Sequence, residues 1–124
     1  MWWLIAAILV GVLAAAVAVT PADVRDDALS ECLIKQSASP TLRDEGYRLA
    51  EIVIFRTGTT PWSWKPIDRA VDAEFAARPM MTTHVDAPVE QSDRPVPLAH
   101  CLAVIDSPRV KAAMATILSR PSRR

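Results

Sequence analysis

The chain has 124 residues, and its 14 basic and 14 acidic side chains give a formal net charge of zero. A balanced charge without a binding motif argues against nucleic acid as a partner. The three glycines lie far apart, which excludes a glycine-rich loop that cradles phosphate. Serine, histidine and aspartate are present, but no nucleophile elbow frames them. The sequence therefore predicts no enzyme, no catalytic residue and no cofactor.

Residues 1–22 contain no charged side chain. A helix of that length reaches about 33 Å, which is enough to cross a hydrocarbon core of about 30 Å. Trp2 and Trp3 lie at one end, where indoles favour the membrane boundary. At the other end, Pro21 and the aspartates after it are expected to close the apolar segment. A signal peptide, cleaved or uncleaved, is the alternative, but the run is long for one and lacks a basic start. We expect a single-pass transmembrane anchor over residues 1–22.

The compartment follows from the charges and the cysteines. The residues directly after the run are mostly acidic, whereas basic loops tend to stay in the cytoplasm. The alanine- and arginine-rich composition suggests a bacterial source, so we expect the bacterial inner membrane with the body on the periplasmic side. In an oxidising space, an even pair of cysteines in a small domain usually forms a disulfide. We expect a bond between Cys32 and Cys101, and the alternative is two buried free thiols.

Two helices are predicted in the first half of the body. Residues 23–37 place five apolar side chains on one helical face: Val24, Ala28, Leu29, Cys32 and Leu33. Residues 39–58 form the second helix, with Ser39 as its cap, Pro40 in its first position and Gly58 as its stop. Its expected buried face consists of Leu42, Leu49 and Val53. The stretch 51–55 is rich in β-branched residues, so a strand is the alternative there.

A third helix and an extended segment follow. Pro61 is expected to force a turn and Pro66 to open a helix that stops at Pro79. Its apolar stripe consists of Ile67, Ala70, Val71 and Phe75. The acidic side chains of these helices are interpreted as solvated faces: Asp44, Glu45, Asp68, Asp72 and Glu74. Residues 79–97 are polar and rich in proline, which predicts an extended strap.

The last part of the chain contains a short apolar run at residues 98–105 and the most regular helical pattern of the body. Ser107 is expected to cap that last helix and Pro108 to begin it. Its apolar face consists of Val110, Ala113, Met114, Ile117 and Leu118. Residues 107–124 carry basic side chains and no acid: Arg109, Lys111, Arg120, Arg123 and Arg124. We expect this basic amphipathic helix and tail to dock on an acidic partner or on lipid.

The predicted fold class is therefore mainly α. One transmembrane helix precedes a small, mostly helical exported body at residues 23–106, which includes the strap, and the body is followed by the basic helix and tail.

Two tryptophans stand out as candidates for binding. Trp62 and Trp64 flank Ser63 in a rigid turn, and tryptophan is enriched at interaction hot spots. In the alternative, one indole fills the core while the other covers it. The predicted partner interface combines this turn with the last helix, and it consists of Trp62, Trp64, Val110, Met114, Ile117, Leu118 and Arg120.

A copper site is a weaker alternative. It combines thioether, imidazole and thiolate ligands from Met80, Met81, His84, His100 and Cys101. Their spacing matches no ligand loop, and ligation by Cys101 would forbid the disulfide. The sequence therefore predicts no metal site.

The predicted function is that of a non-catalytic accessory or assembly subunit of a larger bacterial membrane protein complex. Its expected partners are that complex and membrane lipid. A secreted, small disulfide-bonded binding protein, released by signal-peptide cleavage, is the main alternative. A protein that disrupts the cell envelope is a third.

Overall fold

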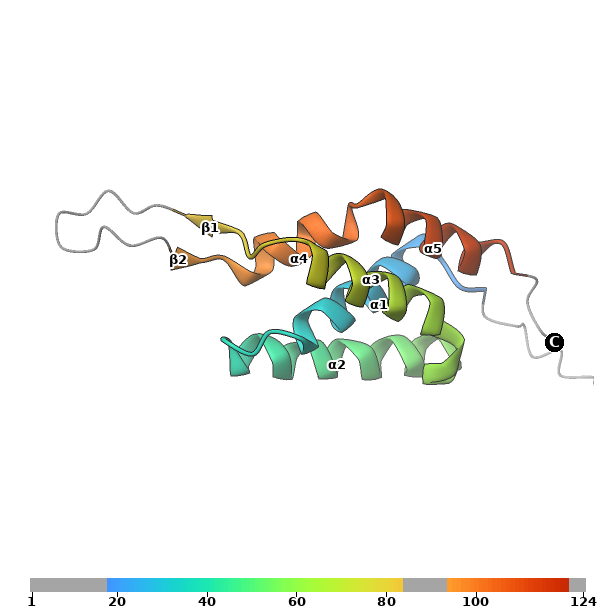
Figure 1. Ribbon diagram of the computed structural model, residues 1–124. Coiled ribbons are helices and arrows are strands. Elements are labelled where there is room, and N and C mark those ends of the chain that lie inside the picture. The colour runs from blue at the N-terminus through green and yellow to red at the C-terminus, as the bar shows by residue number, and fades with distance from the viewer. Residues whose placement is uncertain (1–17, 84–93, 121–124) are drawn as a thin grey trace, which may run out of the picture.

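The computed structural model describes residues 18–83 and 94–120. These residues form a mainly helical body, which confirms that part of the predicted fold class. Its elements are α1 (Pro21–Ile34), α2 (Pro40–Thr57), the 3₁₀ helix η1 (Pro61–Trp64), α3 (Lys65–Ala77), β1 (Thr82–Thr83), β2 (Arg94–Pro95), α4 (Pro97–Ile105) and α5 (Pro108–Leu118). Helix α1 is central, because it packs against each of the other four α-helices (Figure 1). Helix α2 covers one side of α1, while α4 and α5 lie on the other.

The predicted membrane anchor lies mostly outside the described residues, which begin at Ala18. Within residues 18–83 and 94–120, no helix is both long enough and apolar enough to cross a bilayer. Pro21 begins the first helix of the body. Proline fits there because the first turn of a helix leaves its N–H groups without a helical partner.

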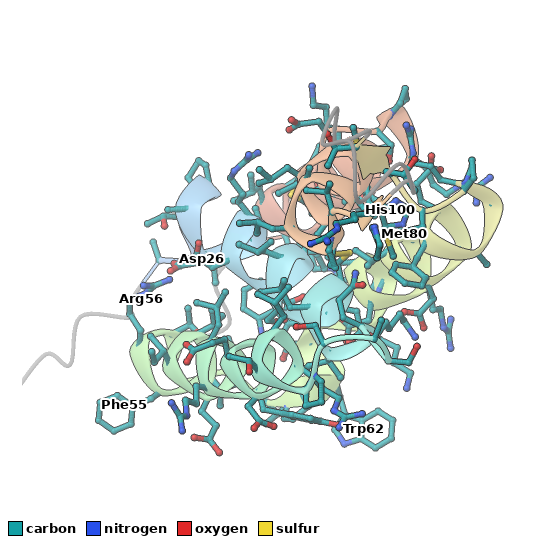
Figure 2. The ribbon with its side chains drawn as sticks, turned by 90° about the vertical axis from the view of Figure 1, so that its left-hand side faces the viewer. Asp26, Phe55, Arg56, Trp62, Met80 and His100 are labelled. Carbon is teal, nitrogen blue, oxygen red and sulfur yellow. A yellow bond between two sulfur atoms is a disulfide. The ribbon has the colours of Figure 1, made fainter. Side chains whose placement is uncertain are left out.

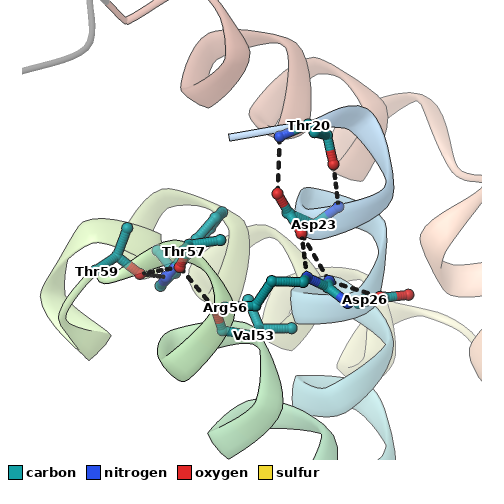
Figure 3. Close-up of polar contacts among 8 residues, drawn as sticks. Thr20, Asp23, Asp26, Val53, Arg56, Thr57 and Thr59 are labelled. Atoms are coloured by element: carbon teal, nitrogen blue, oxygen red, sulfur yellow. Dashed lines mark hydrogen bonds and ion pairs between the residues drawn. The ribbon is translucent and has the colours of Figure 1, made fainter. Parts of the chain in front are cut away.

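The start of α1 is fixed by a capping box (Figure 3). The Thr20 hydroxyl accepts a hydrogen bond from the Asp23 backbone N–H, at 3.3 Å. In return, the Asp23 carboxylate accepts from the Thr20 N–H, at 2.8 Å. Both bonds satisfy N–H groups that a helix start otherwise leaves unpaired. Helix α1 therefore begins two residues before the helix predicted at residues 23–37.

Helix α2 agrees with its sequence signals. The Ser39 side chain accepts from the Leu42 N–H at 3.4 Å, and the helix ends at Gly58, whose φ of 65° lies in the left-handed region. The β-branched second half is helical throughout, so the strand alternative is wrong. Gly46 is required at the point where α1 passes, since a Cβ there would lie 2.9 Å from the Ile34 backbone nitrogen.

Each described helix starts with a proline in its first two positions. Proline has no N–H to lose there and its φ already suits a helix. Ser107 caps α5 as predicted, accepting from the Val110 N–H at 3.4 Å. The apolar run predicted at residues 98–105 is helix α4.

The predicted strap is only partly described. Its two ends pair antiparallel as β1 and β2, with Thr82 opposite Pro95 and Thr83 opposite Arg94. One further bond joins the Val96 N–H to the Met81 carbonyl, at 2.8 Å. This ladder leaves one end of the body, opposite the end where α5 finishes (Figure 1). Residues 84–93 between the strands, including His84, lie outside the described part.

The core draws on every helix. Its buried apolar residues are Val24, Ala28, Cys32, Leu33, Val53, Trp64, Ile67, Val71, Cys101, Val104, Ile105, Val110 and Ile117. Within it, the predicted disulfide is confirmed: Cys32 of α1 bonds to Cys101 of α4, with Cα atoms 5.6 Å apart. The buried Gln36 side chain donates from Nε2 to the Cys101 sulfur at 3.1 Å. The bond therefore ties the first body helix to the fourth at the centre of the core.

Candidate functional site

One end of the helical body brings together distant parts of the chain. The start of α1, the end of α2, η1, the start of α3 and the end of α5 all lie there (Figure 1). Two contacts hold it together: Arg56 Nε donates to Asp23 Oδ1 at 2.7 Å, and Arg120 Nη1 donates to the Ser63 carbonyl at 3.4 Å. We call this the joining end, because residue 18 enters the body there.

The joining end is defined by five residues: Thr20, Phe55, Trp62, Lys65 and Arg120.

The two acidic side chains at the joining end share Arg56 as their partner, and its single positive charge offsets one of their two negative charges (Figure 3). Its guanidinium bonds Asp23 and also reaches Asp26 Oδ2 at 3.0 Å. Burial raises the pKa of Asp23, but the hydrogen bonds from Thr20 and Arg56 outweigh it, so the pKa is lowered. Asp23 is therefore ionised at neutral pH, and its charge is balanced locally.

A second network fixes the turn that follows α2 (Figure 3). The Thr57 hydroxyl donates to the Val53 carbonyl at 2.7 Å and lies 2.8 Å from the Thr59 hydroxyl. Trp64 Nε1 donates to the same Thr59 oxygen at 2.7 Å. Trp64 is only 1 % exposed, so this network satisfies its indole N–H inside the core.

Two aromatic rings at the joining end remain in solvent. Phe55 is 92 % exposed and Trp62 is 76 % exposed. Both project away from the body on the side that α2 forms (Figure 2). The Lys65 ammonium lies 4.9 Å from the centre of the Trp62 ring, a cation–π contact. Tryptophan is enriched at protein interfaces and at the membrane–water boundary, so Trp62 is a candidate for contact.

The outer face of α2 beyond Phe55 is not apolar. Tyr47 and Ile52 are about half exposed, on the two flanks of this face. Between them, at helical spacing, lie charged and exposed side chains: Asp44, Arg48 and Glu51. Arg48 pairs with Glu45 at 3.3 Å on the same helix. Phe55 is thus a single ring at the end of a charged face.

A second exposed apolar group lies on α4, a helix without any charged residue. Leu98 is 46 % exposed and Leu102 is 41 % exposed, one helical turn apart. Met81 is also exposed, and its carbonyl bonds the residue just before α4. We call these three residues the α4 patch.

The structure divides the predicted partner interface into buried and exposed parts. Trp64, Val110 and Ile117 belong to the core of the body. Met114 is half-buried and packs against that core. The residues of the predicted interface that reach solvent are Trp62, Leu118 and Arg120. Trp64 fills the core, as the alternative interpretation had it, whereas Trp62 remains in solvent and does not cover the core.

Sequence reasoning missed Phe55 and the α4 patch. A signal for Phe55 was available, because it lies four residues after Glu51 and seven after Arg48, on the charged stripe of α2. An aromatic residue on a charged stripe is out of register with the core. No such signal marked Leu98 and Leu102, since all of α4 is apolar or neutral.

Four carboxylates meet between α1 and α3, where the sequence suggested solvated faces for Asp68 and Asp72. Asp27 and Glu31 lie one turn apart on α1, and the other two lie one turn apart on α3. Lys35 joins the helices, with its Nζ 3.0 Å from Asp72 Oδ1 and 3.7 Å from Glu31 Oε1. The interpretation of Asp68 and Glu74 as solvated is wrong, because both are half-buried. Asp27, for which no prediction was made, is buried. We call the four the carboxylate cluster.

The carboxylate cluster holds protons at neutral pH. Burial, together with the neighbouring Asp68 carboxyl, raises the pKa of Asp27 to about 9. Burial and the Asp72 carboxyl raise the pKa of Glu31 to about 7. A protonated Asp27 donates a hydrogen bond to Asp68, which removes a charge that the buried site could not otherwise hold.

Cys101 cannot serve as the copper ligand of the alternative prediction, because its sulfur forms the disulfide with Cys32. His100 is buried, with its ring edge-on to Phe75 at 5.1 Å. Burial, with the charge of Arg78, lowers its pKa. Across the described residues, no three His, Cys, Asp or Glu side chains group in a way that could hold a metal ion.

Comparison of the chain with models of protein families, with curated proteins and with solved structures gave no match. The function proposed below therefore depends on the residues and contacts described above.

Proposed function

We propose that this chain is a non-catalytic, single-pass membrane subunit that works by contact with a larger bacterial membrane protein complex. The apolar run before α1 anchors it in the inner membrane, and the body lies on the periplasmic side. The proposal depends on one observation: large apolar side chains are exposed to solvent although the body has a closed, disulfide-bonded core. They are Tyr47, Ile52, Phe55, Trp62, Met81, Leu98, Leu102 and Leu118.

The anchor and the disulfide support the same compartment. An uncharged run of this length is typical of a membrane span. A disulfide in the core is typical of a protein that folds in an oxidising space such as the periplasm.

The α4 patch is the part of the body best suited to bind another protein. Its leucines are one turn apart on a helix with no charge, so a partner can bury them without desolvating an ion. It lies toward the end that carries β1 and β2, away from the joining end (Figure 1). A neighbouring subunit of the complex is the occupant we propose for it.

The alternative is a secreted, disulfide-bonded binding protein. It is favoured by the capping box of Thr20 and Asp23, which starts the body cleanly just after the apolar run. A chain cleaved near that point would keep its core and its disulfide.

The experiment is a mild-detergent purification of the tagged full-length chain from its own cells. Leu102→Ser should lose the co-purifying subunits, because it places a hydroxyl in the contact. Leu118→Ser, an exposed leucine on α5, is the matched control and should retain them. If Leu118→Ser loses the partners and Leu102→Ser keeps them, the docking element is the basic C-terminal helix and not the α4 patch.

A further inference from the structure

We propose that the joining end of the body lies on the lipid headgroups of the membrane, with Phe55 and Trp62 inserted at the boundary. The long axis of the body is then perpendicular to the bilayer, with β1, β2 and the start of α4 farthest from it. This inference rests on the anchored chain proposed above, and it names the surface of the body that meets lipid.

The connection between the apolar run and α1 is short. Every side chain from Leu4 to Val17 is apolar or glycine, and only Ala18, Val19 and Thr20 follow before Pro21 begins α1. Even fully extended, three residues span only about 11 Å. Val19 is not available as a free spacer, because it packs against the core. An anchor that ends there must hold the start of α1 close to the bilayer surface.

The two exposed rings lie at the joining end. Phe55 comes directly before Arg56, which bonds Asp23 in the first turn of α1. Trp62 lies in η1, next to the end of α5, as the bond from Arg120 to Ser63 shows. The two most exposed large apolar side chains of the described body thus lie at the end that the apolar run enters. Indole and phenyl rings favour the membrane–water boundary.

The charges of the joining end also suit lipid headgroups. Asp23 and Asp26, the acids that face this end, share Arg56, which offsets one of their two charges. Lys65 and Arg120 are exposed there, and Lys65 lies over the Trp62 ring. A ring that enters the boundary with an ammonium above it can contact acyl chains and a headgroup phosphate at the same time. Each basic residue near an anionic leaflet adds about 1 kcal/mol to the free energy of membrane binding, which corresponds to about a fivefold higher affinity.

The orientation is end-on because the outer face of α2 is unsuited to lie flat on lipid. Asp44 and Glu51 occupy the middle of that face. Laying α2 along the membrane would press both carboxylates against anionic headgroups, which repel them. Only its last turn, with Phe55, suits the boundary.

The test is photo-cross-linking of the full-length chain in vesicles of phosphatidylethanolamine and phosphatidylglycerol. Benzoylphenylalanine replaces Phe55, Trp62 or Tyr47, one at a time. Tyr47 is the matched control, since it is an exposed aromatic residue on α2 about 12 Å further from the joining end. The three positions are at the surface, and an intact disulfide on a non-reducing gel shows that each variant has folded.

We expect phospholipid adducts at positions 55 and 62 to exceed those at position 47 by about fivefold or more. Lys65→Gln with Arg120→Gln should reduce the adducts at position 62. Equal yields at the three positions, in chains that stay in the vesicles through an alkaline carbonate wash, would overturn the orientation but leave the anchor standing. Chains that the wash removes would overturn the proposed function and this inference with it.

Discussion

Arg56, in the last turn of α2, donates a hydrogen bond to the carboxylate of Asp23, in the first turn of α1, at 2.7 Å. Asp23 is almost fully buried and also accepts from the Thr20 N–H. One carboxylate therefore closes the start of the first helix and ties it to the end of the second. Because the apolar run enters the body at Thr20, this pair links the body to its expected anchor.

Asp23→Asn tests that relationship. It keeps the shape of the side chain and removes its charge, so we expect the free energy of unfolding to fall by about 1–2 kcal/mol at pH 7. The pKa of Asp23 is lowered in the fold, so its contribution is present at neutral pH and is lost as pH falls through that lowered value. Urea unfolding of the full-length chain in mild detergent, at pH 7 and pH 3, measures both effects.

Glu45→Gln is the control, because its partner Arg48 is an exposed neighbour on the same helix. Surface pairs of this kind contribute about 0–1 kcal/mol. If the two variants lose the same stability, the Asp23 pair has no special role.

The carboxylate cluster makes the body less stable as pH rises. The folded state holds a proton on Asp27 up to about pH 9, whereas the unfolded chain releases it near the ordinary value of 3.8. Between these values the fold binds more protons, so the free energy of unfolding falls by up to about 1.4 kcal/mol per pH unit. Glu31 adds to the fall between its ordinary value of 4.5 and about pH 7.

Asp27→Asn should remove much of that slope, because an amide can donate to Asp68 without releasing a proton. Urea unfolding at pH 5, 6.5 and 8 compares the variant with the native chain and with Asp44→Asn, an exposed control. The prediction is contradicted if Asp27→Asn keeps the native slope.

The disulfide should carry a large share of the stability. For a loop between Cys32 and Cys101, the chain-entropy argument gives about 4 kcal/mol as an upper figure. Replacing both cysteines with serine should lower the melting temperature. A thiol reagent should modify neither Cys32 nor Cys101 in the native chain until the disulfide is reduced. Free labelling of Cys32 or Cys101 in freshly isolated protein would place the body in a reducing compartment.

Two adjacent apolar residues of α5 differ in their exposure to solvent. Ile117 is buried and Leu118 is exposed. Ile117→Ser should cost about 2–4 kcal/mol, since it removes buried apolar atoms and adds an unpaired hydroxyl. Leu118→Ser should change stability by less than about 0.5 kcal/mol. Thermal unfolding followed by circular dichroism distinguishes them, and equal losses would show that α5 packs differently.

The helices could be predicted because their signals are local. Ser39, Gly58 and Ser107 cap or stop helices through bonds to residues three or four positions away. Prolines mark where helices begin, and Pro21 begins α1 just after the apolar run. The disulfide followed from two cysteines and an inferred compartment.

The site could not be predicted as well, because it depends on packing between distant segments. Trp62 and Trp64 are the same residue type on either side of Ser63, and only the fold decides which one enters the core. The carboxylate cluster exists because α1 faces α3, and neither helix alone shows that Asp27 meets Asp68. The pairing of β1 with β2 involves two residues on each strand, too few to leave a pattern.

The anchor is the central element of the proposed function, and intact mass measured on carbonate-washed membranes tests it directly. We predict that the membrane fraction retains the full-length chain, residues 1–22 included, with the disulfide formed. Recovery of most of the protein in the soluble fraction, with an amino terminus near Asp23, would contradict the account and favour a secreted binding protein.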